Sequence, residues 1–303
     1  MKFTRTRVTD THLNTKLAYL LLFIGVSGIS SAAVLIRLTN TPALIIASYR
    51  MVISALIILV IAVFRHSFYR INWQEKEVML SFLSGIILAL HFWSWISSLK
   101  YTSVSSSTII VTTQPIFVIL GSWLLFDEKI SLRSIGYLSL AFAGSALIGY
   151  ADTYLGDQVL LGDGLAFIGA VTFAGYLILG KIIRKKMDIW TYAGISYSSS
   201  ALMLIMLSIG TSTANYAITT NDLLIFTMLA LLSTVVGHTI FNWLIKYIGA
   251  TTVSISILGE PIGATILAAI ILKEYPSITQ IAGGIIVIFG VAMFLKTQTI
   301  NKS

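Results

Sequence analysis

The strongest constraint in this sequence is a series of ten apolar segments, each long enough to cross a lipid bilayer. A spanning helix needs roughly 20 apolar residues, because each residue adds about 1.5 Å of length. Only 11% of the residues are charged, whereas soluble domains carry about 25%. We therefore predict an all-α polytopic membrane protein with ten transmembrane helices over residues 17–36, 43–64, 79–99, 104–126, 132–150, 162–181, 190–210, 223–243, 249–272 and 278–296.

Lys and Arg residues divide unequally between the two sides that these helices would create. With the N-terminus in the cytoplasm, 16 of the 20 lie on the cytoplasmic side, and only Arg37, Lys100 and Lys273 lie on the outer side. Basic residues concentrate in cytoplasmic loops. We therefore predict a multi-pass protein of the cytoplasmic (inner) membrane with both termini in the cytoplasm. The same rule accounts for the net charge of +8, so the lipid bilayer is an expected partner and nucleic acid is not.

Several classes of chemistry have no support in the sequence. Cysteine is absent, so there is no disulfide framework and no thiolate site, and the redox compartment stays open. The motifs H-E-x-x-H, G-x-S-x-G and G-x-x-x-x-G-K-[ST] are also absent. We expect no metal, no cofactor, no enzymatic activity and no ATP-driven transport.

The two halves of the chain repeat each other. The segments "TTQPIFVILGSWLLFDEKIS" and "LGEPIGATILAAIILKEYPS" align at a constant offset of 146, which matches Pro115 with Pro261 and Glu128 with Glu274. Matches between apolar residues are common among membrane helices. A proline and a glutamate that both recur at one offset indicate an internal duplication.

The duplication fixes the relation between the halves. Each half has five helices, an odd number, so the second half enters the membrane in the opposite sense. We predict a first repeat over 1–150 and a second, inverted repeat over 151–303, packed around a central cavity. This architecture is typical of secondary transporters, which bind solute near the bilayer midplane between the repeats.

The two matched prolines predict helix kinks close to that midplane. Proline lacks a backbone N–H, so Pro261 leaves the carbonyl of Ile257 without its helical partner, and Pro115 does the same to Val111. In lipid such a carbonyl must find another donor or line a wet cavity. Kinks that only shape helix packing are the alternative interpretation.

Two charges lie inside predicted helices. Glu260 is near the bilayer centre, where a charged side chain costs about 2.5–3.5 kcal/mol on insertion scales. We predict that it binds a proton or the amino group of a solute; a structural, protonated carboxyl is the alternative. Its counterpart in the first half is Gln114. Arg50 is expected to face the cavity and to pair with Glu260 or hold a solute carboxylate, with snorkelling to the outer interface as the alternative.

Polar and aromatic side chains mark two further helices. His91 and Trp95 are four residues apart and share a helical face, as do His238 and Asn242. These faces are expected to point into the bundle, although a buried core and an interfacial aromatic belt remain alternatives. Three tyrosines could stack on a solute together with Trp95: Tyr49, Tyr176 and Tyr197.

The repeated pattern resembles a known family. The segments "SLKYTSVSSSTIIVTTQPIFVILGSWLLFDEKIS" and "LIKYIGATTVSISILGEPIGATILAAIILKE" are similar to the drug/metabolite transporter superfamily, in its ten-helix EamA-like branch of metabolite exporters. The resemblance implies two inverted repeats around a cavity that opens to one side at a time. It also implies roles for Glu260 in the solute path and for Glu128 and Glu274 as structural acids at helix ends. Gln114 departs from an acidic pattern, so the site is asymmetric.

Together these observations predict a secondary active or facilitative transporter that exports small metabolites, with amino acids or related zwitterions as first choice, by alternating access. Protons are a candidate coupling ion. Cationic drugs and nucleoside-type metabolites are alternative cargoes. A lipid scramblase or an intramembrane enzyme is the alternative from another class. The oligomeric state is not predicted.

Overall fold

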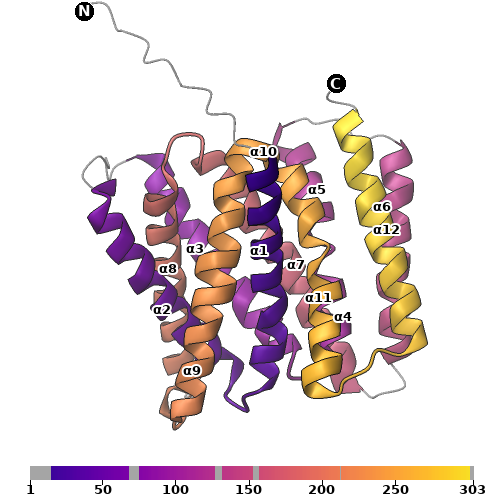
Figure 1. Ribbon diagram of the computed structural model, residues 1–303, viewed down its shortest axis with the longest axis horizontal. Helices are drawn as coiled ribbons and strands as arrows, with labels where there is room; N and C mark the ends of the chain where they lie inside the picture. Colours follow the sequence, from indigo (N-terminus) through magenta and orange to yellow (C-terminus); the bar gives the residue numbers. More distant parts are fainter. Residues whose placement is uncertain (1–14, 68–74, 127–131, 153–156, 212, 301–303) are drawn as a thin grey trace, which may run out of the picture.

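The computed structural model describes residues 15–67, 75–126, 132–152, 157–211 and 213–300, and the regular elements in these ranges are all helical (Figure 1). The predicted all-α fold is confirmed. In chain order the elements are α1 (Thr15–Arg37), α2 (Ala43–Phe64), α3 (Lys76–Ser98), α4 (Val104–Val111), α5 (Gln114–Phe126), α6 (Leu132–Asp152), α7 (Asp157–Ile183), α8 (Ile189–Gly210), the short η3 (Thr213–Asn215), α9 (Thr220–Met228), the π-helix η4 (Leu229–His238), α10 (Thr239–Ile257), α11 (Glu260–Leu267), the π-helix η5 (Ala268–Leu272) and α12 (Ile278–Ile300).

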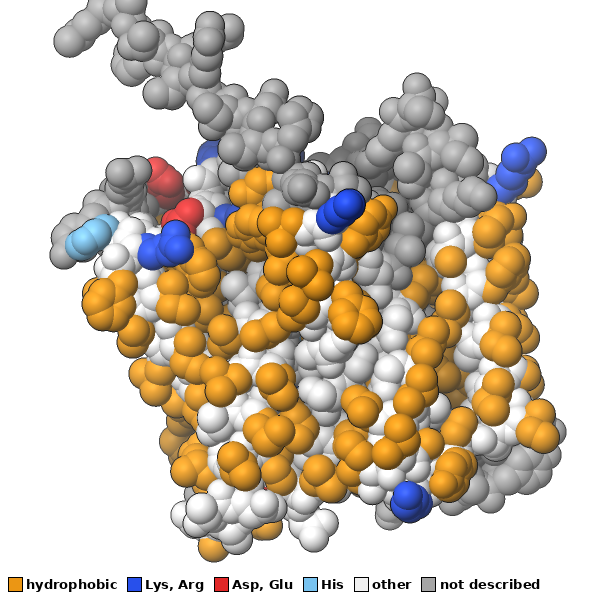
Figure 2. Space-filling model, in the orientation of Figure 1, with side chains coloured by type: hydrophobic (Ala, Val, Ile, Leu, Met, Phe, Trp, Pro, Cys, Tyr) orange, Lys and Arg blue, Asp and Glu red, His pale blue; other side chains and the backbone are white. Residues whose placement is uncertain are grey.

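Within the described residues these elements form the ten predicted spans. Six helices are long and apolar enough to cross a bilayer, and shorter apolar helices over Val104–Val118, Ile135–Ile148, Glu260–Leu272 and Ile278–Met293 complete the set. Figure 2 shows the corresponding surface, with apolar side chains over the middle of the bundle and the visible charged side chains gathered toward its two ends. The first residues of α1 and the last of α12 lie at the same end (Figure 1).

The two matched prolines break their helices at equivalent positions. α4 ends at Val111 and α10 ends at Ile257, which are the residues four before Pro115 and Pro261. α5 and α11 then restart at Gln114 and Glu260, so each proline occupies the second position of the new helix. A missing N–H costs least in a helix's first turn. The predicted kinks are therefore complete breaks.

One predicted connection differs. We expected a short loop between residues 243 and 249, but α10 runs without interruption from Thr239 to Ile257. A helix meets its backbone hydrogen bonds internally, and this segment contains no proline to end it. The chain therefore passes from the eighth span to the ninth through residues that are helical, at the end of the bundle where Figure 1 labels α10. Glu128, expected to close the fourth span, falls outside the described residues.

The bundle has a dense centre and a peripheral pair. The main apolar core joins α2, α3, α7 and α8, while α6 and α12 pack closely against each other at one edge (Figure 1). Glycines allow this approach. A Cβ atom on Gly290 would lie 2.9 Å from both the backbone carbonyl oxygen of Tyr137 and the backbone nitrogen of Ala141. Small residues permit such contacts between membrane helices.

We expect Gly290→Leu to destabilise the protein by about 1–3 kcal/mol, because the new side chain must push α6 away from α12. The midpoint temperature of unfolding in detergent measures this. Gly136→Leu on α6 is the matched control, since a Cβ atom there meets nothing within 4 Å. Equal midpoints for the two variants would contradict the close packing of α6 on α12.

Candidate functional site

The two helix breaks meet at one small central cavity. Gln114 and Glu260, the first residues of α5 and α11, both line it, together with Val111 and Ile257 at the preceding helix ends. The cavity volume is about 20 Å³, which holds a water molecule but not a metabolite. A solute of metabolite size therefore does not fit the cavity in this structure.

Five of the residues predicted from the sequence share this cavity: Glu260, Gln114, His91, Trp95 and His238. His91 and Trp95 come from α3, and their rings stack with centroids 6.1 Å apart. His238 ends η4, and its ring lies 6.5 Å from that of His91. The remaining walls are mostly apolar and comprise Ile29, Val111, Phe173, Ser233, Phe241 and Ile257.

The tautomer of His91 follows from its partner. Its Nδ1 lies 2.9 Å from the carbonyl oxygen of Gly169 on α7. A carbonyl only accepts hydrogen bonds, so Nδ1 carries the proton and Nε2 is left as an acceptor in the neutral ring. His91 therefore offers the site an acceptor that α7 holds in place.

Arg50 lies behind the cavity wall and does not snorkel, because its side chain is fully buried. Its Nε donates to the Thr234 hydroxyl at 2.8 Å and its Nη2 to the Ser233 hydroxyl at 2.8 Å. The guanidinium carbon lies 4.1 Å from the centre of the Phe92 ring, a cation–π contact. No ion pair joins Arg50 to Glu260 among the described residues, so this structure does not contain the pairing that was one of the two roles expected of Arg50.

Two buried N–H donors around the site have no hydrogen-bond partner in the described part of the chain. They are Nη1 of Arg50 and Nε1 of Trp95. A buried donor without a partner costs about 1–3 kcal/mol, and more when it is charged. Such atoms in a native site point to a missing acceptor, such as water or a ligand oxygen.

Four other predicted site residues, Asn242, Tyr176, Tyr197 and Tyr49, do not line the cavity. Asn242 donates to the Tyr176 hydroxyl at 3.0 Å and to the His238 carbonyl at 2.8 Å. The Tyr197 hydroxyl lies 3.2 Å from that of Thr239. Tyr49 is half-buried against Phe226, with ring centroids 5.4 Å apart. Of these contacts, the bond from Asn242 to His238 reaches a residue that lines the cavity.

The sequence analysis did not single out Ser233 and Thr234, which hold Arg50. Both lie in the π-helix η4, where the backbone bond spans five residues. A π-helix has more residues per turn than an α-helix, so different side chains face the inside of the bundle. A sequence pattern read with the α-helical period of 3.6 residues therefore assigns Ser233 and Thr234 to the wrong face. The available signal was a Ser-Thr pair inside the otherwise apolar stretch "LALLSTVV".

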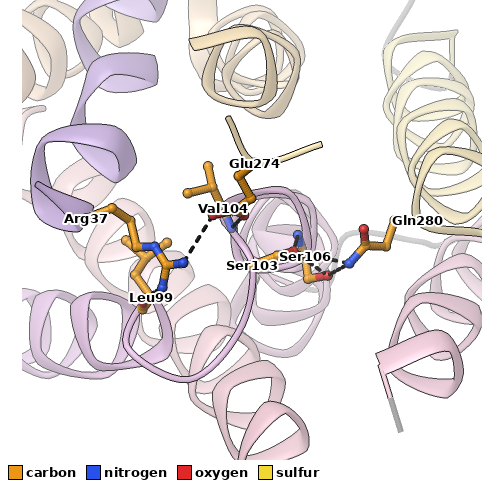
Figure 3. A network of polar contacts seen from close by, with 7 residues as sticks. All are labelled: Arg37, Leu99, Ser103, Val104, Ser106, Glu274 and Gln280. Atoms are coloured by element: carbon orange, nitrogen blue, oxygen red, sulfur yellow. Dashed lines mark hydrogen bonds and ion pairs between the residues drawn. The ribbon is translucent and has the colours of Figure 1, made fainter. Parts of the chain in front are cut away.

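One end of the bundle is closed by a polar network across both halves of the chain (Figure 3). Arg37 at the end of α1 pairs with Glu274 at 3.2 Å and donates to the Leu99 carbonyl at 2.9 Å. The second Glu274 oxygen accepts from the backbone N–H of Val104, at the start of α4. Beside this link, Gln280 of α12 donates to the hydroxyls of Ser103 and Ser106.

Lys100 adds to the same closed end. Its ammonium donates to the Thr39 carbonyl at 2.7 Å. Partial burial lowers the pKa of Lys100 from its ordinary value. Arg37 and Lys100 are two of the three basic residues predicted for the outer side, and both connect helix ends there.

The opposite end has a simpler ionic contact. Lys186, which follows α7, pairs with Glu77 in the first turn of α3 at 2.6 Å. This carboxylate raises the pKa of Lys186 above its ordinary value. Both ends of the bundle are therefore linked by ion pairs between helices.

Comparison with known proteins is consistent with this architecture. The sequence profile of the EamA-like transporter family matches residues 16–150 and 160–296, once for each half. The chain belongs to the EamA-like transporter family. The resemblance noted from the sequence is thereby confirmed.

Relatives and a solved structure agree with the assignment. An uncharacterized transporter of Archaeoglobus fulgidus is 26% identical over 231 residues, covering 75% of this chain and 78% of its own. The uncharacterized transporter YyaM of Bacillus subtilis is 24% identical over 253 residues, 81% of this chain and 82% of its own. A crystal structure with 16% identity aligns over 96% of this chain and 100% of its own, with a TM-score of 0.68, and so has the same fold.

We expect Thr234→Val to lower the free energy of unfolding by about 1–3 kcal/mol, because Arg50 Nε loses its acceptor while remaining buried. Thermal unfolding in detergent measures the change. Thr227→Val is the control: that hydroxyl bonds only the Leu223 carbonyl of its own helix. A Thr234→Val protein as stable as the control would show that Arg50 does not depend on this bond.

Proposed function

We propose that this family member is a secondary transporter that moves small metabolites across the cytoplasmic membrane by alternating access, in the direction of export. The observation that carries the proposal is Glu260, an acid that lines a central cavity where two broken helices meet. An intramembrane carboxyl facing a cavity is typical of a solute or proton pathway. Each end of the helix bundle is held by an ion pair, Arg37–Glu274 at one end and Lys186–Glu77 at the other. A movement that opens the cavity to that side would have to release the pair.

The preferred cargo in this proposal is an amino acid or a related zwitterion. Glu260 is placed to bind an ammonium group or a proton. The unpartnered Nε1–H of Trp95, which lines the cavity, suits an oxygen of a carboxylate. The unpartnered Nη1 of Arg50, behind the wall, would reach such an oxygen only once the cavity widens. Phe173 and Phe241 would then contact an apolar side chain.

We expect Glu260→Gln to abolish the dependence of transport on a pH gradient, because the amide mimics the protonated acid and cannot exchange a proton. Proteoliposomes with an imposed pH gradient and a panel of labelled amino acids measure this. Glu75→Gln removes an exposed acid outside the cavity and should keep the dependence. Gradient-driven transport that survives in Glu260→Gln would show that protons couple elsewhere or not at all.

The cargo itself is tested in cells. Strains with the wild type, Glu260→Gln or an empty vector are compared by profiling small molecules in the medium. Amino acids that accumulate only with the wild type support export. Three identical profiles would contradict export and favour uptake or lipid scrambling.

We expect Trp95→Phe to lower kcat/KM for amino acids roughly ten- to a hundredfold, because a hydrogen bond to a charged group is worth about 1.5–3 kcal/mol. Matched amines without the carboxylate should lose much less, since they make no hydrogen bond to the indole N–H and feel only the change to a smaller ring. Trp93→Phe, on the same helix and partly exposed, is the control. An equal loss for amino acids and amines would assign Trp95 to packing instead.

A further inference from the structure

A narrow apolar groove runs along the outside of the bundle between α11 and α12, with α4 as its floor. Its volume is about 210 Å³. Its lining includes Ser105 and Ile109 of α4, Pro261 and Ile266 of α11, and Gln280 and Ile285 of α12. It therefore lies on the seam between an element of the first half and two elements of the second.

The groove opens to the surface that faces the bilayer. Its rim carries four isoleucines, of which Ile266 is 54% and Ile285 64% exposed. Figure 2 shows this side of the molecule as largely apolar over α11 and α12. Within a membrane the surrounding solvent is hydrocarbon, so the natural occupant of an apolar groove there is an acyl chain.

The length of the groove matches one leaflet. On α12 the lining residues run from Gln280 to Ile288, about 12 Å at 1.5 Å per residue. The hydrocarbon core is about 30 Å thick, so one leaflet contributes about 15 Å. Its deep end at Pro261 lies beside Glu260, which faces the central cavity on the other side of α11.

The few polar groups in the groove are already engaged with each other. The hydroxyls of Ser105 and Thr265 lie 3.1 Å apart and link α4 to α11. Gln280 donates to Ser106 at 3.0 Å, as Figure 3 shows. The lining therefore suits an alkyl chain and not a polar solute.

The shallow end of the groove carries a cation. Lys273 caps η5 and is exposed, and it precedes the lining residue Pro276 by at most about 11 Å of chain. Arg37 and Glu274 neutralise each other at this end, whereas Lys273 forms no ion pair with any described residue. A lipid phosphate would complement this charge.

From these contacts we infer a phospholipid site: one acyl chain occupies the groove between α11 and α12, and the phosphate lies at Lys273. The lipid fills the seam between α4 and the second half. The lipid therefore contacts the outer face of α11, the helix whose inner face carries Glu260. This site is separate from the central cavity and does not depend on the proposed cargo.

Native mass spectrometry of the purified full-length protein in detergent with added phosphatidylglycerol tests the site. We expect one retained lipid on the wild type and on Ile270→Trp. We expect at least a tenfold loss of that adduct in Ile266→Trp, whose indole fills the groove. Ile270 is similarly exposed, at 62%, but does not line the groove. Lys273→Gln should lower retention several-fold.

A second matched pair on α12 covers the case in which Ile266→Trp does not fold. Ile285→Trp is the groove variant, and Phe289→Trp, at an exposed residue that does not line the groove, is its control. Equal lipid retention in the groove variants and their controls would overturn the site. Retention that Lys273→Gln leaves unchanged would overturn the position of the phosphate.

Discussion

The structure depends on how a helical backbone is interrupted inside lipid. Hydrocarbon offers no hydrogen-bond partners, so an interruption is tolerated only where protein or a wet cavity surrounds it. The breaks before Pro115 and Pro261 satisfy this condition by facing the same interior point. α1 contributes directly, since the Ser30 hydroxyl donates to the Glu260 carbonyl at 3.3 Å. The central cavity thus lies where two helices lose backbone hydrogen bonds, a position that the surrounding hydrocarbon would not tolerate.

The duplication supplies symmetric geometry, and single substitutions make the chemistry asymmetric. The two broken helices restart at positions 146 residues apart, yet one begins with Gln114 and the other with Glu260. Arg50 likewise has no basic counterpart in the second half: this earlier segment aligns at an offset of 148, where Ser198 stands. The two halves therefore share their helix breaks but differ in these charged residues.

The second half also departs from regular helix geometry near the site. The π-helix η4 carries Ser233, Thr234 and His238, and so brings both Arg50 and the cavity into contact with one short segment. At the end closed by Arg37 and Glu274, contacts again cross between the halves. The site and its closure therefore both rest on pairings between residues far apart in the chain.

The sequence by itself predicted the ten spans, the duplication and two helix kinks, because bilayer thickness and the missing proline N–H act locally along the chain. Only the structure showed that both kinks are complete breaks. The sequence also identified Glu260, Gln114, His91, Trp95 and His238, since polar groups at membrane depth are few. Only the tertiary structure decided that Arg50 contacts hydroxyls instead of Glu260, that Tyr176 and Asn242 support the wall, and that Ser233 and Thr234 take part. Those outcomes depend on helix rotation and π-helical register, which are set by packing between distant segments and leave no local pattern.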